Sequence, residues 1–329
     1  NITVTTPIDE ENTDYTITRL LLLGAAESGK TTLLEQIRLL YKQNYSDAEF
    51  MHRKAFIYNN ILISIRKLIE RMSHTGTAYS NPENARCAGK IMAEDETQFA
   101  CFTAEISDAI QKVWKDPAVQ KRDEVNKEPV LEVVLDGFLE NLSNINRLDF
   151  TPTPRDLIMS YVPTVGVQNV IFSAGNRVFQ LFDIGGQRID RRKWATMYDG
   201  IDAIFFCIAI SEYDQVMVED PGTNRLQDSL SLLEKISNEP KFKNTPLLLF
   251  LNEIDVFREK LPLFPLESHL PGYKGTSVED GMDFVENLAR KCLMGRDEST
   301  IHIYRTCMID TEHMSIILED AFQTVLSLS

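Results

Sequence analysis

The sequence contains few cysteines, fewer basic than acidic residues and no long apolar run. Its five cysteines among 329 residues include no CxxC pair, which indicates buried, reduced thiols of a cytosolic protein. The longest uninterrupted apolar run is Ala203–Ile210, whereas a membrane-spanning helix needs roughly twenty apolar residues. No signal peptide is recognisable in the first residues. These absences argue against a chain that crosses a bilayer and favour a cytosolic protein.

The charge balance is acidic, with a formal net charge of −15. A surface that binds nucleic acid broadly needs a basic face, so this balance argues against nucleic acid as a partner. It leaves the binding of a single nucleotide open, because backbone amides and one lysine can form a local phosphate site.

Two patterns of apolar residues alternate along the chain. An apolar segment at 17–23 precedes a loop at 24–29 and a helical pattern at 30–41, which is the order of an α/β nucleotide fold. Apolar strands return later, at 169–173, 177–184, 202–210, 246–252 and 301–307. In between, apolar residues recur at helical spacing, in stripes such as Ile57, Ile61, Ile65, Leu68 and Ile69, and Phe99, Phe102, Ile106, Ile110 and Val113.

The late strands alternate with helical segments such as 224–237 and 311–327. This alternation predicts a mostly parallel sheet covered by helices on both faces. The predicted fold class is therefore α/β, with a six-stranded sheet in a nucleotide-binding domain and an all-helical domain inserted into it. We expect the nucleotide-binding domain to comprise residues 1–43 and 159–329, and the helical domain to comprise residues 44–158.

Residues 24–31 match the phosphate-binding pattern G-x4-GK[ST]. Backbone N–H groups of such a loop and the following helix N-terminus bind phosphates, while the lysine reaches the β- and γ-phosphates and the hydroxyl binds Mg²⁺. The alternative is a chance match in a turn, and the strand and helix on either side argue against it. The expected nucleotide-binding residues are Gly24, Ala25, Ala26, Glu27, Ser28, Gly29, Lys30, Thr31 and Thr32.

Two further segments carry groups suited to phosphate chemistry. Asp183 ends an apolar strand and could hold a Mg²⁺-bound water, Gly186 would let a backbone N–H approach the γ-phosphate, and Gln187 could orient an attacking water. Thr164, before the second strand, could give Mg²⁺ a second hydroxyl beside that of Thr31. Taken alone, the first segment could be an ordinary Asp-Gly-Gly turn and Thr164 an ordinary turn residue.

The residues Asn252-Glu253-Ile254-Asp255 follow another apolar strand. A carboxylate at Asp255 can accept hydrogen bonds from both N1 and N2 of guanine, whereas adenine offers no such pair of donors. The motif is weak alone, because Asn and Asp are common after strands. Its place after the two phosphate motifs favours a guanine site.

In this order, the motifs resemble those of the alpha subunits of heterotrimeric G proteins. GAAESGKTT is similar to the family's GAGESGKST, and DIGGQRIDRRKW is similar to its DVGGQR…KKW. PLLLFLNEIDVF, VWKDPAVQ and RTCMIDT also follow the family. The resemblance covers about residues 17–329 and implies a P-loop GTPase domain with an inserted helical domain. Small GTPases lack this insertion.

The resemblance implies a guanine-nucleotide switch in transmembrane signalling that binds GTP or GDP with Mg²⁺. Gln187 would be catalytic, the metal ligands would be Thr31, Thr164 and (through water) Asp183, and Cys307 and Met308 would join the guanine site. The implied partners are a beta-gamma dimer, a seven-helix receptor, an effector and a GTPase-accelerating protein. The implied location is the cytoplasmic face of the plasma membrane.

Four residues depart from the family pattern. Tyr161 stands where the family has a catalytic arginine, three residues before Thr164, and a neutral phenol cannot stabilise the charge of the transition state. Ala26 replaces a loop glycine and is expected to crowd the γ-phosphate. Glu253 replaces a lysine that covers the guanine ring and braces the phosphate loop. Met308 replaces an alanine whose backbone N–H meets guanine O6.

The departures leave three interpretations. The first is a switch with slow intrinsic GTP hydrolysis, and the second is a signalling module that binds nucleotide with little or no unaided hydrolysis. The third is a P-loop kinase, which would prefer ATP and need a phosphate acceptor. The acidic residues before Gly24 carry no Met-Gly start, and the chain ends before the family's receptor-contacting tail. Either the ends are trimmed or those functions are reduced.

Overall fold

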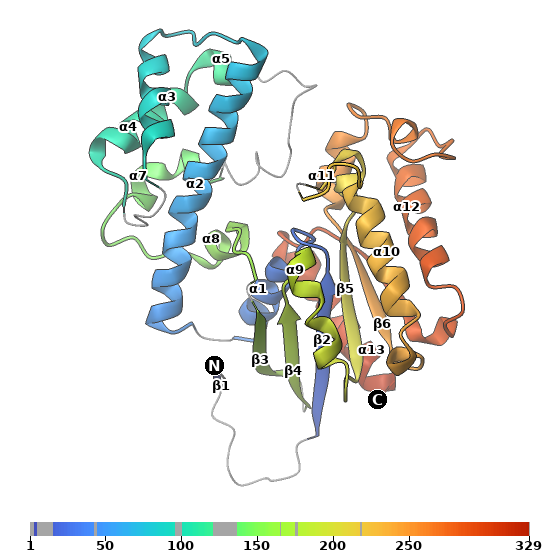
Figure 1. The fold of residues 1–329 in the computed structure, drawn as a ribbon. Coiled ribbons are helices and arrows are strands. Elements are labelled where there is room, and N and C mark those ends of the chain that lie inside the picture. Colours follow the sequence, from blue (N-terminus) through green and yellow to red (C-terminus); the bar gives the residue numbers. More distant parts are fainter. Residues whose placement is uncertain are drawn as a thin grey trace. The chain divides into compact units, whose positions relative to one another are not determined.

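The computed structural model describes most of the chain (Figure 1). The described residues are 3–4, 16–42, 45–95, 101–120, 137–164, 166–174, 177–217 and 219–328. None of the helices within these ranges is long and apolar enough to cross a bilayer.

One sheet of seven strands forms the centre of the nucleotide-binding part, in the order β1-β3-β4-β2-β5-β6-β7. Neighbouring strands are parallel except for the antiparallel pair β3–β4. The structure confirms the six predicted strands. It adds a seventh, β1, whose two residues are too few to show an apolar pattern. The strands are β1 (Thr3–Val4), β2 (Ile17–Gly24), β3 (Val167–Ala174), β4 (Arg177–Ile184), β5 (Ala203–Ala209), β6 (Leu247–Asn252) and β7 (Ile301–Thr306).

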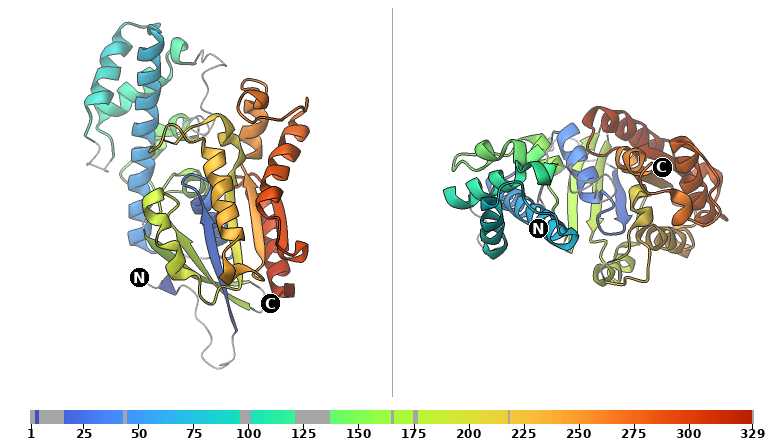
Figure 2. Two further views of the ribbon diagram at one scale, coloured as in Figure 1. Left: turned by 45° about the vertical axis from the view of Figure 1, so that its right-hand side comes forward. Right: turned by 90° about the horizontal axis from the view of Figure 1, so that it is seen from above.

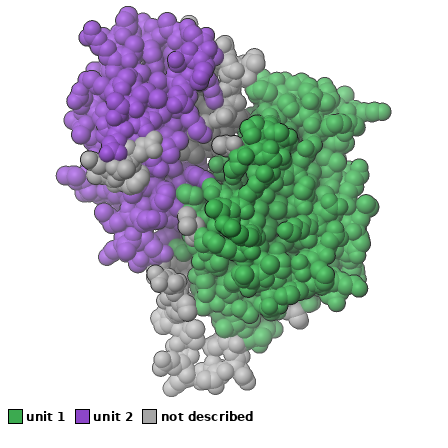
Figure 3. Space-filling model, viewed as in Figure 1, with its two compact units in different colours: residues 1–44, 163–329 green, residues 45–162 purple. Residues whose placement is uncertain are grey.

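The chain divides into two compact units, residues 1–44 with 163–329 and residues 45–162 (Figure 3). The second boundary lies a few residues later than the predicted 158/159. The reason is local, since the backbone N–H of Tyr161 donates to Asn60 Oδ1 (2.7 Å) and its carbonyl accepts from Asn60 Nδ2 (3.0 Å). These bonds attach the end of the helical segment to a helix of the same unit.

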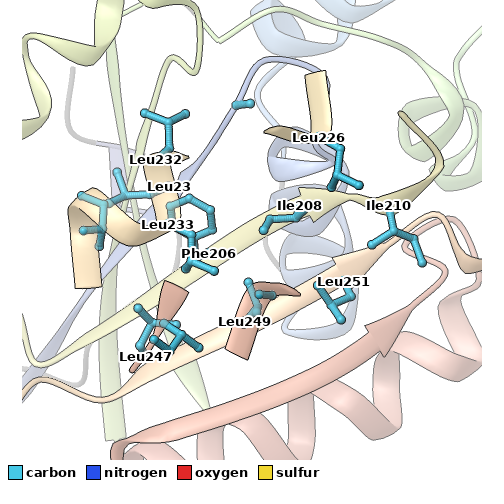
Figure 4. Packing of buried hydrophobic residues seen from close by; sticks show 14 of the residues in the cluster. Leu23, Phe206, Ile208, Ile210, Leu226, Leu232, Leu233, Leu247, Leu249 and Leu251 are labelled. Atoms are coloured by element: carbon cyan, nitrogen blue, oxygen red, sulfur yellow. The ribbon is translucent and has the colours of Figure 1, made fainter. Parts of the chain in front are cut away.

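Apolar side chains alternate between the two faces of the sheet. Leu20 and Leu22 of β2 pack with helices α1 (Lys30–Leu40) and α13 (Thr311–Leu328). Leu21 and Leu23 lie on the opposite face, with α10 (Arg225–Ser237) and α12 (Val278–Cys292), whose ribbons are drawn in Figure 2. Figure 4 shows Leu23 close to Leu233 of α10. Each of the four leucines of β2 is fully buried, which contributes about 1.5–3 kcal/mol per side chain relative to exposure.

Short elements complete this unit at both ends of the strands. Helix α9 (Arg188–Arg191) follows β4, and α11 (Ile254–Lys260) follows β6. Single 3₁₀ turns lie at 194–197, 210–214, 240–242, 266–268 and 298–300.

The second unit is helical, and no strand forms in the part of it that is described. Its long helix α2 begins at a capping box between Ser46 and Glu49 and ends at Gly76, which has a φ of 66°. The stripe from Ile57 to Ile69 is buried along α2, and Ile106, Ile110 and Val113 are buried in α4, while Phe99 lies outside the described residues. The helices are α2 (Asp47–Thr75), α3 (Glu83–Ala93), α4 (Ala104–Trp114), α5 (Pro117–Gln120), α7 (Leu142–Ile145) and α8 (Pro154–Met159).

Asp116 fixes the junction between α4 and α5. It is buried and accepts hydrogen bonds from the N–H groups of Ser80 (3.0 Å), Asn81 (3.2 Å) and Ala118 (2.8 Å) and from Asn84 Nδ2 (2.8 Å). Burial alone would raise the pKa of Asp116, but these hydrogen bonds outweigh it and lower the pKa to about 2. The ionised carboxylate therefore stabilises this unit.

We expect Asp116→Asn to lower the free energy of unfolding of the helical unit by about 2–3 kcal/mol, because charged hydrogen bonds to buried donors are lost. Urea unfolding followed by the fluorescence of the buried Trp114 measures this change. The pKa of Asp116 is lower in the folded state, so its stabilisation is complete above the unfolded value and disappears as pH falls toward 2. The difference in the free energy of unfolding between wild type and Asp116→Asn should narrow as the pH falls toward 2. A difference that does not change with pH would contradict the assignment. Asp108→Asn, at an exposed ion pair with Lys112, is the control.

Candidate nucleotide site

The predicted site residues lie at the carboxyl ends of adjacent strands. Gly24 at the end of β2 is paired with Cys207 of β5, and Ala209 at the end of β5 is paired with Asn252 of β6. Asp183 is the penultimate residue of β4, on the other side of β2. In open α/β sheets, ligands bind outside the carboxyl ends of the strands. The topology therefore brings the phosphate and guanine motifs to one edge of the sheet.

The phosphate loop requires glycine at two positions. Gly24 has a φ of 148°, and a Cβ there would lie 2.5 Å from the carbonyl oxygen of Cys207. Gly29 has a φ of 94° just before α1, and a Cβ there would lie 2.8 Å from the sulfur of Met308. Between them, Glu27 adopts a φ of 63°, which is uncommon for a residue with a side chain. The loop is thus held in a tight turn at a helix N-terminus, where anions bind.

The carbonyl of Ala25 accepts two side-chain hydrogen bonds inside this loop. Lys30 Nζ donates at 2.6 Å and Ser28 Oγ at 2.9 Å. Burial lowers the pKa of Lys30, and the nearby Asp183 carboxylate opposes this by favouring the ammonium form. A buried amine beside a tight loop of backbone amides fits a phosphate group as its counter-charge.

The three predicted metal ligands are brought together from three segments. Thr31 Oγ1 lies 3.2 Å from Thr164 Oγ1, and Thr164 Oγ1 donates to Asp183 Oδ2 at 2.9 Å. Two hydroxyls and one carboxylate suit Mg²⁺, which prefers oxygen ligands and usually keeps waters and substrate phosphates. In the described part of the chain, no group of three or more His, Cys, Asp or Glu side chains could hold a metal. Thr32 follows Thr31 in the same helical turn.

Gly186 lies directly against the phosphate loop. A Cβ at this position would lie 2.5 Å from the carbonyl oxygens of both Ala25 and Gly24, so only glycine fits. Gln187 comes next, at the start of α9, and its side chain is exposed. Gln187 is therefore the sequence neighbour of the residue that lies against the phosphate loop, and its exposed side chain has room to turn toward a ligand.

Two residues that the sequence analysis did not single out hold this segment. Arg191 Nε donates to the carbonyl of Gly186 (2.9 Å), and its guanidinium pairs with Asp228 of α10 (2.6 Å). Trp194 Nε1 donates to the carbonyl of Gly185 (3.1 Å). Both lie in the stretch DIGGQRIDRRKW, but nothing in their spacing indicates these contacts.

Asn252 connects the guanine motif to the phosphate loop. Its Oδ1 accepts from the backbone N–H of Met308 (3.1 Å) and from Thr306 Oγ1 (3.3 Å), and its Nδ2 donates to the carbonyl of Ser28 (3.4 Å). The buried amide therefore positions three segments. The N–H of Met308, which the resemblance assigns to guanine O6, donates to Asn252 in this structure.

Asp255 lies in the first turn of α11 and contacts Cys307. Burial raises the pKa of the Cys307 thiol to about 12, and the neighbouring Asp255 carboxylate, to which it hydrogen-bonds, adds to this increase. The thiol is thus protonated at neutral pH and donates to the carboxylate. This contact orients Asp255 beside the segment 306–308.

Comparison with known proteins identifies the family. A family model described as G-protein alpha subunit matches residues 1–325. The chain belongs to the G protein alpha subunit family. It is 51% identical to the guanine nucleotide-binding protein alpha-13 subunit of Caenorhabditis elegans, over 97% of this chain and 92% of that protein. It is 50% identical to the alpha-13 subunit of Caenorhabditis briggsae (98% and 93%) and 33% identical to the alpha-17 subunit of Caenorhabditis elegans (94% and 88%).

Family membership confirms the predicted fold class and makes the chain a guanine nucleotide-binding signalling protein. Homologues also support GTPase activity. The residues that depart from the family pattern can be located within this G protein alpha subunit.

Glu253 occupies a buried acidic environment. The hydroxyl of Ser211 donates to its carboxylate, and its backbone has a φ of 67°. Burial raises the pKa of Glu253 to about 8, with the nearby Glu212 as the next cause, and burial also raises the pKa of Glu212 to about 7. Arg225 opposes both increases. This alpha subunit therefore has two adjacent acids beside its guanine motif.

Tyr161 belongs to the helical unit of this alpha subunit, and its side chain is exposed. Its backbone is fixed at both its N–H and its carbonyl by Asn60. Position 161 therefore has a defined backbone conformation within the helical unit, and the effect of another side chain at this position can be measured by substitution.

Proposed function

We propose that this G protein alpha subunit is a GTP–GDP switch with slow intrinsic hydrolysis. The proposal is carried by a contrast between two observations. The side-chain oxygens of Thr31, Thr164 and Asp183, which we propose as Mg²⁺ ligands, form a hydrogen-bonded series, whereas Tyr161 of the helical unit occupies the position of the family's arginine. Mg²⁺ supplies neutralisation of phosphate charge when bound, and without a cis arginine part of the transition-state charge stays uncompensated.

Each site residue has a proposed role. Lys30 and the loop amides bind the phosphates, Gln187 orients the attacking water, and Asp255 accepts hydrogen bonds from guanine. The contacts of Lys30 inside the loop and the position of Gly186 against it support this arrangement. Asn252 reads guanine mainly by holding the three segments around the base.

We extend the proposal to signalling partners, on the basis of membership in the G protein alpha subunit family. Bound GTP would order the segments around Thr164 and Gly186, and hydrolysis would release them. This change would control binding to a beta-gamma dimer, a seven-helix receptor, an effector and a GTPase-accelerating protein. The proposed location is the cytoplasmic face of the plasma membrane.

A single-turnover assay tests the proposal. Protein preloaded with GTP receives Mg²⁺, and cleavage is followed with and without a candidate accelerating protein. Slow but measurable unaided cleavage supports the switch, and none at all supports the alternative of a binding module. A rate typical of family members that have the arginine would contradict the proposal. Competition by ATP equal to that by GTP would favour the third interpretation, a P-loop kinase.

Gln187→Leu should slow single-turnover hydrolysis by about 10²-fold, in the range of a lost positioned group, and leave GDP affinity unchanged. Leucine cannot orient water but fits the exposed start of α9. The matched control is Gln323→Leu on α13, whose side chain is also exposed. Unchanged hydrolysis in the Gln187 variant would mean that this residue does not position the water.

A further inference from the structure

The outer edge of β3 lacks the features that usually protect the edge of a sheet. On its inner side, β3 pairs with β4 over all eight of its residues in an unbroken register, from Val167 opposite Ile184 to Ala174 opposite Arg177. The strand contains no proline and no charged residue. Charges, prolines, bulges and short length are the devices that keep an edge strand from pairing with other chains. The edge of β3 is therefore suited to accept a further strand.

The opposite edge of the sheet, formed by β7, is different. β7 carries the charged Arg305, whose guanidinium pairs with Glu286 (2.8 Å) and Asp283 (2.5 Å) of α12. The carbonyl of Arg305 accepts a hydrogen bond from His313 Nε2 (3.1 Å). A charged residue and these side-chain contacts protect β7, whereas β3 needs another element for that purpose.

β1 lies along the outer edge of β3. Thr3 is opposite Val170 and Val4 is opposite Ile171, and the two strands are parallel. β1 lies within a run of five β-branched residues, 2–6, and residues of this type are enriched in strands. The local sequence therefore favours the addition of this segment to the sheet.

The connection from β1 to β2 is long enough for β1 to leave the edge and return. Because β3 is antiparallel to β4, β1 runs toward the end of the sheet at which β2 begins. In the order β1-β3-β4-β2, the two strands are three strand spacings apart, which is about 14 Å. The twelve residues 5–16 join them, and an extended chain of this length spans about 40 Å. The connectivity thus permits the pairing without enforcing it.

In the described part of the chain, this cover extends over two of the eight residues of β3, so it forms few hydrogen bonds. Edges of this kind bind extended segments of other chains through main-chain hydrogen bonds. We propose that β1 is an exchangeable cover, and that the edge of β3 binds an extended, uncharged segment of a partner protein when β1 leaves. That segment would be rich in β-branched residues, like the run 2–6, and parallel to β3.

A peptide added to the full chain tests this proposal. The probe is a fluorescently labelled peptide of residues 1–6, and its binding is followed by fluorescence polarisation. Thr3→Pro with Val4→Pro removes N–H groups from β1 and should free the edge, so this variant should bind the peptide at least tenfold more tightly than wild type does. A tenfold difference means that the wild-type edge is free about a tenth of the time. Asp9→Pro with Glu10→Pro places two prolines outside β1 and should bind like wild type.

A disulfide between opposite residues locates the binding edge. Val4→Cys with Ile171→Cys should form a disulfide within one chain on oxidation, because paired residues of adjacent strands are about 5 Å apart. Mass spectrometry identifies the linked segments, and Val4→Cys alone is the control for the native cysteines. The oxidised chain should not bind the peptide, and reduction should restore binding at the wild-type level.

Four outcomes would overturn the proposal, with thermal unfolding showing that each variant is folded. The first is no binding of millimolar peptide by the proline variant, and the second is no disulfide between residues 4 and 171. The third is equal binding of the peptide by the oxidised and reduced chains, which would place the peptide elsewhere. The fourth is a disulfide that joins two chains, which would assign the edge of β3 to β1 of a second copy.

Discussion

Tyr161→Arg is expected to raise the single-turnover rate of GTP cleavage at least tenfold, toward the roughly 10³–10⁵-fold that such arginines contribute. That value comes from the enzyme class, including G alpha subunits, and not from this chain. A guanidinium can neutralise the negative charge that spreads over the γ-phosphate oxygens, which the phenol of Tyr161 cannot do. Within the helical unit, Asn60 already holds the backbone of residue 161 through its N–H and its carbonyl.

Two further variants make this experiment decisive. Tyr161→Phe removes only the hydroxyl and should leave the rate unchanged. The double variant Tyr161→Arg with Ala26→Gly tests whether the loop methyl blocks the transition state. A gain only in the double variant would identify Ala26 as the limiting residue. No gain in either, with nucleotide affinity unchanged, would refute the assignment of position 161.

Asp255→Asn should lower the affinity for GDP by about 10²–10⁴-fold, because a site built to hydrogen-bond a substrate discriminates strongly when one partner is changed. An amide offers one acceptor and one donor, whereas guanine presents two donors, N1 and N2, to this edge. Xanthine has a carbonyl at the position of the guanine amino group. The variant should therefore bind xanthosine diphosphate better than GDP, measured by competition with a fluorescent nucleotide.

The contact between Asp255 and Cys307 requires its own control. Cys307→Ala removes the thiol that hydrogen-bonds the carboxylate and should preserve the preference for guanine. Asp283→Asn, at an ion pair with Arg305 on the surface of α12, should change neither affinity. If the Asp255 variant still prefers GDP to xanthosine diphosphate, Asp255 does not read the base.

Much of the fold can be predicted from the sequence, because its strands are local apolar runs. Leu20–Leu23, followed by the phosphate loop and α1, form the predicted strand, loop and helix at nearly the predicted bounds. The two-residue β1 is too short to carry a pattern, and it pairs with β3 only through tertiary structure. The antiparallel direction of β3 is likewise set by its short connection to β4.

The site residues likewise differ in whether a short sequence motif or only the tertiary structure reveals them. Lys30, Thr31 and Asp183 can be found because motif spacing fixes their place on a loop or strand end. Arg225 cannot be found in this way, because the loop carbonyl that it binds lies 199 residues away in the sequence. These contacts of Arg225 depend on how α10 meets the phosphate loop and the turn after β5, which no short sequence pattern encodes.

The pairing of β2 has a consequence for how the chain is made. β2 pairs with β4 and β5, and neither strand is synthesised until the whole helical unit has been synthesised. At about 5–20 residues per second, the four leucines Leu20–Leu23 wait on the order of ten seconds without their partners. An apolar strand with two open edges is a substrate for chaperones and a site of aggregation. The insertion thus lengthens the time during which β2 is exposed in the nascent chain without its partner strands.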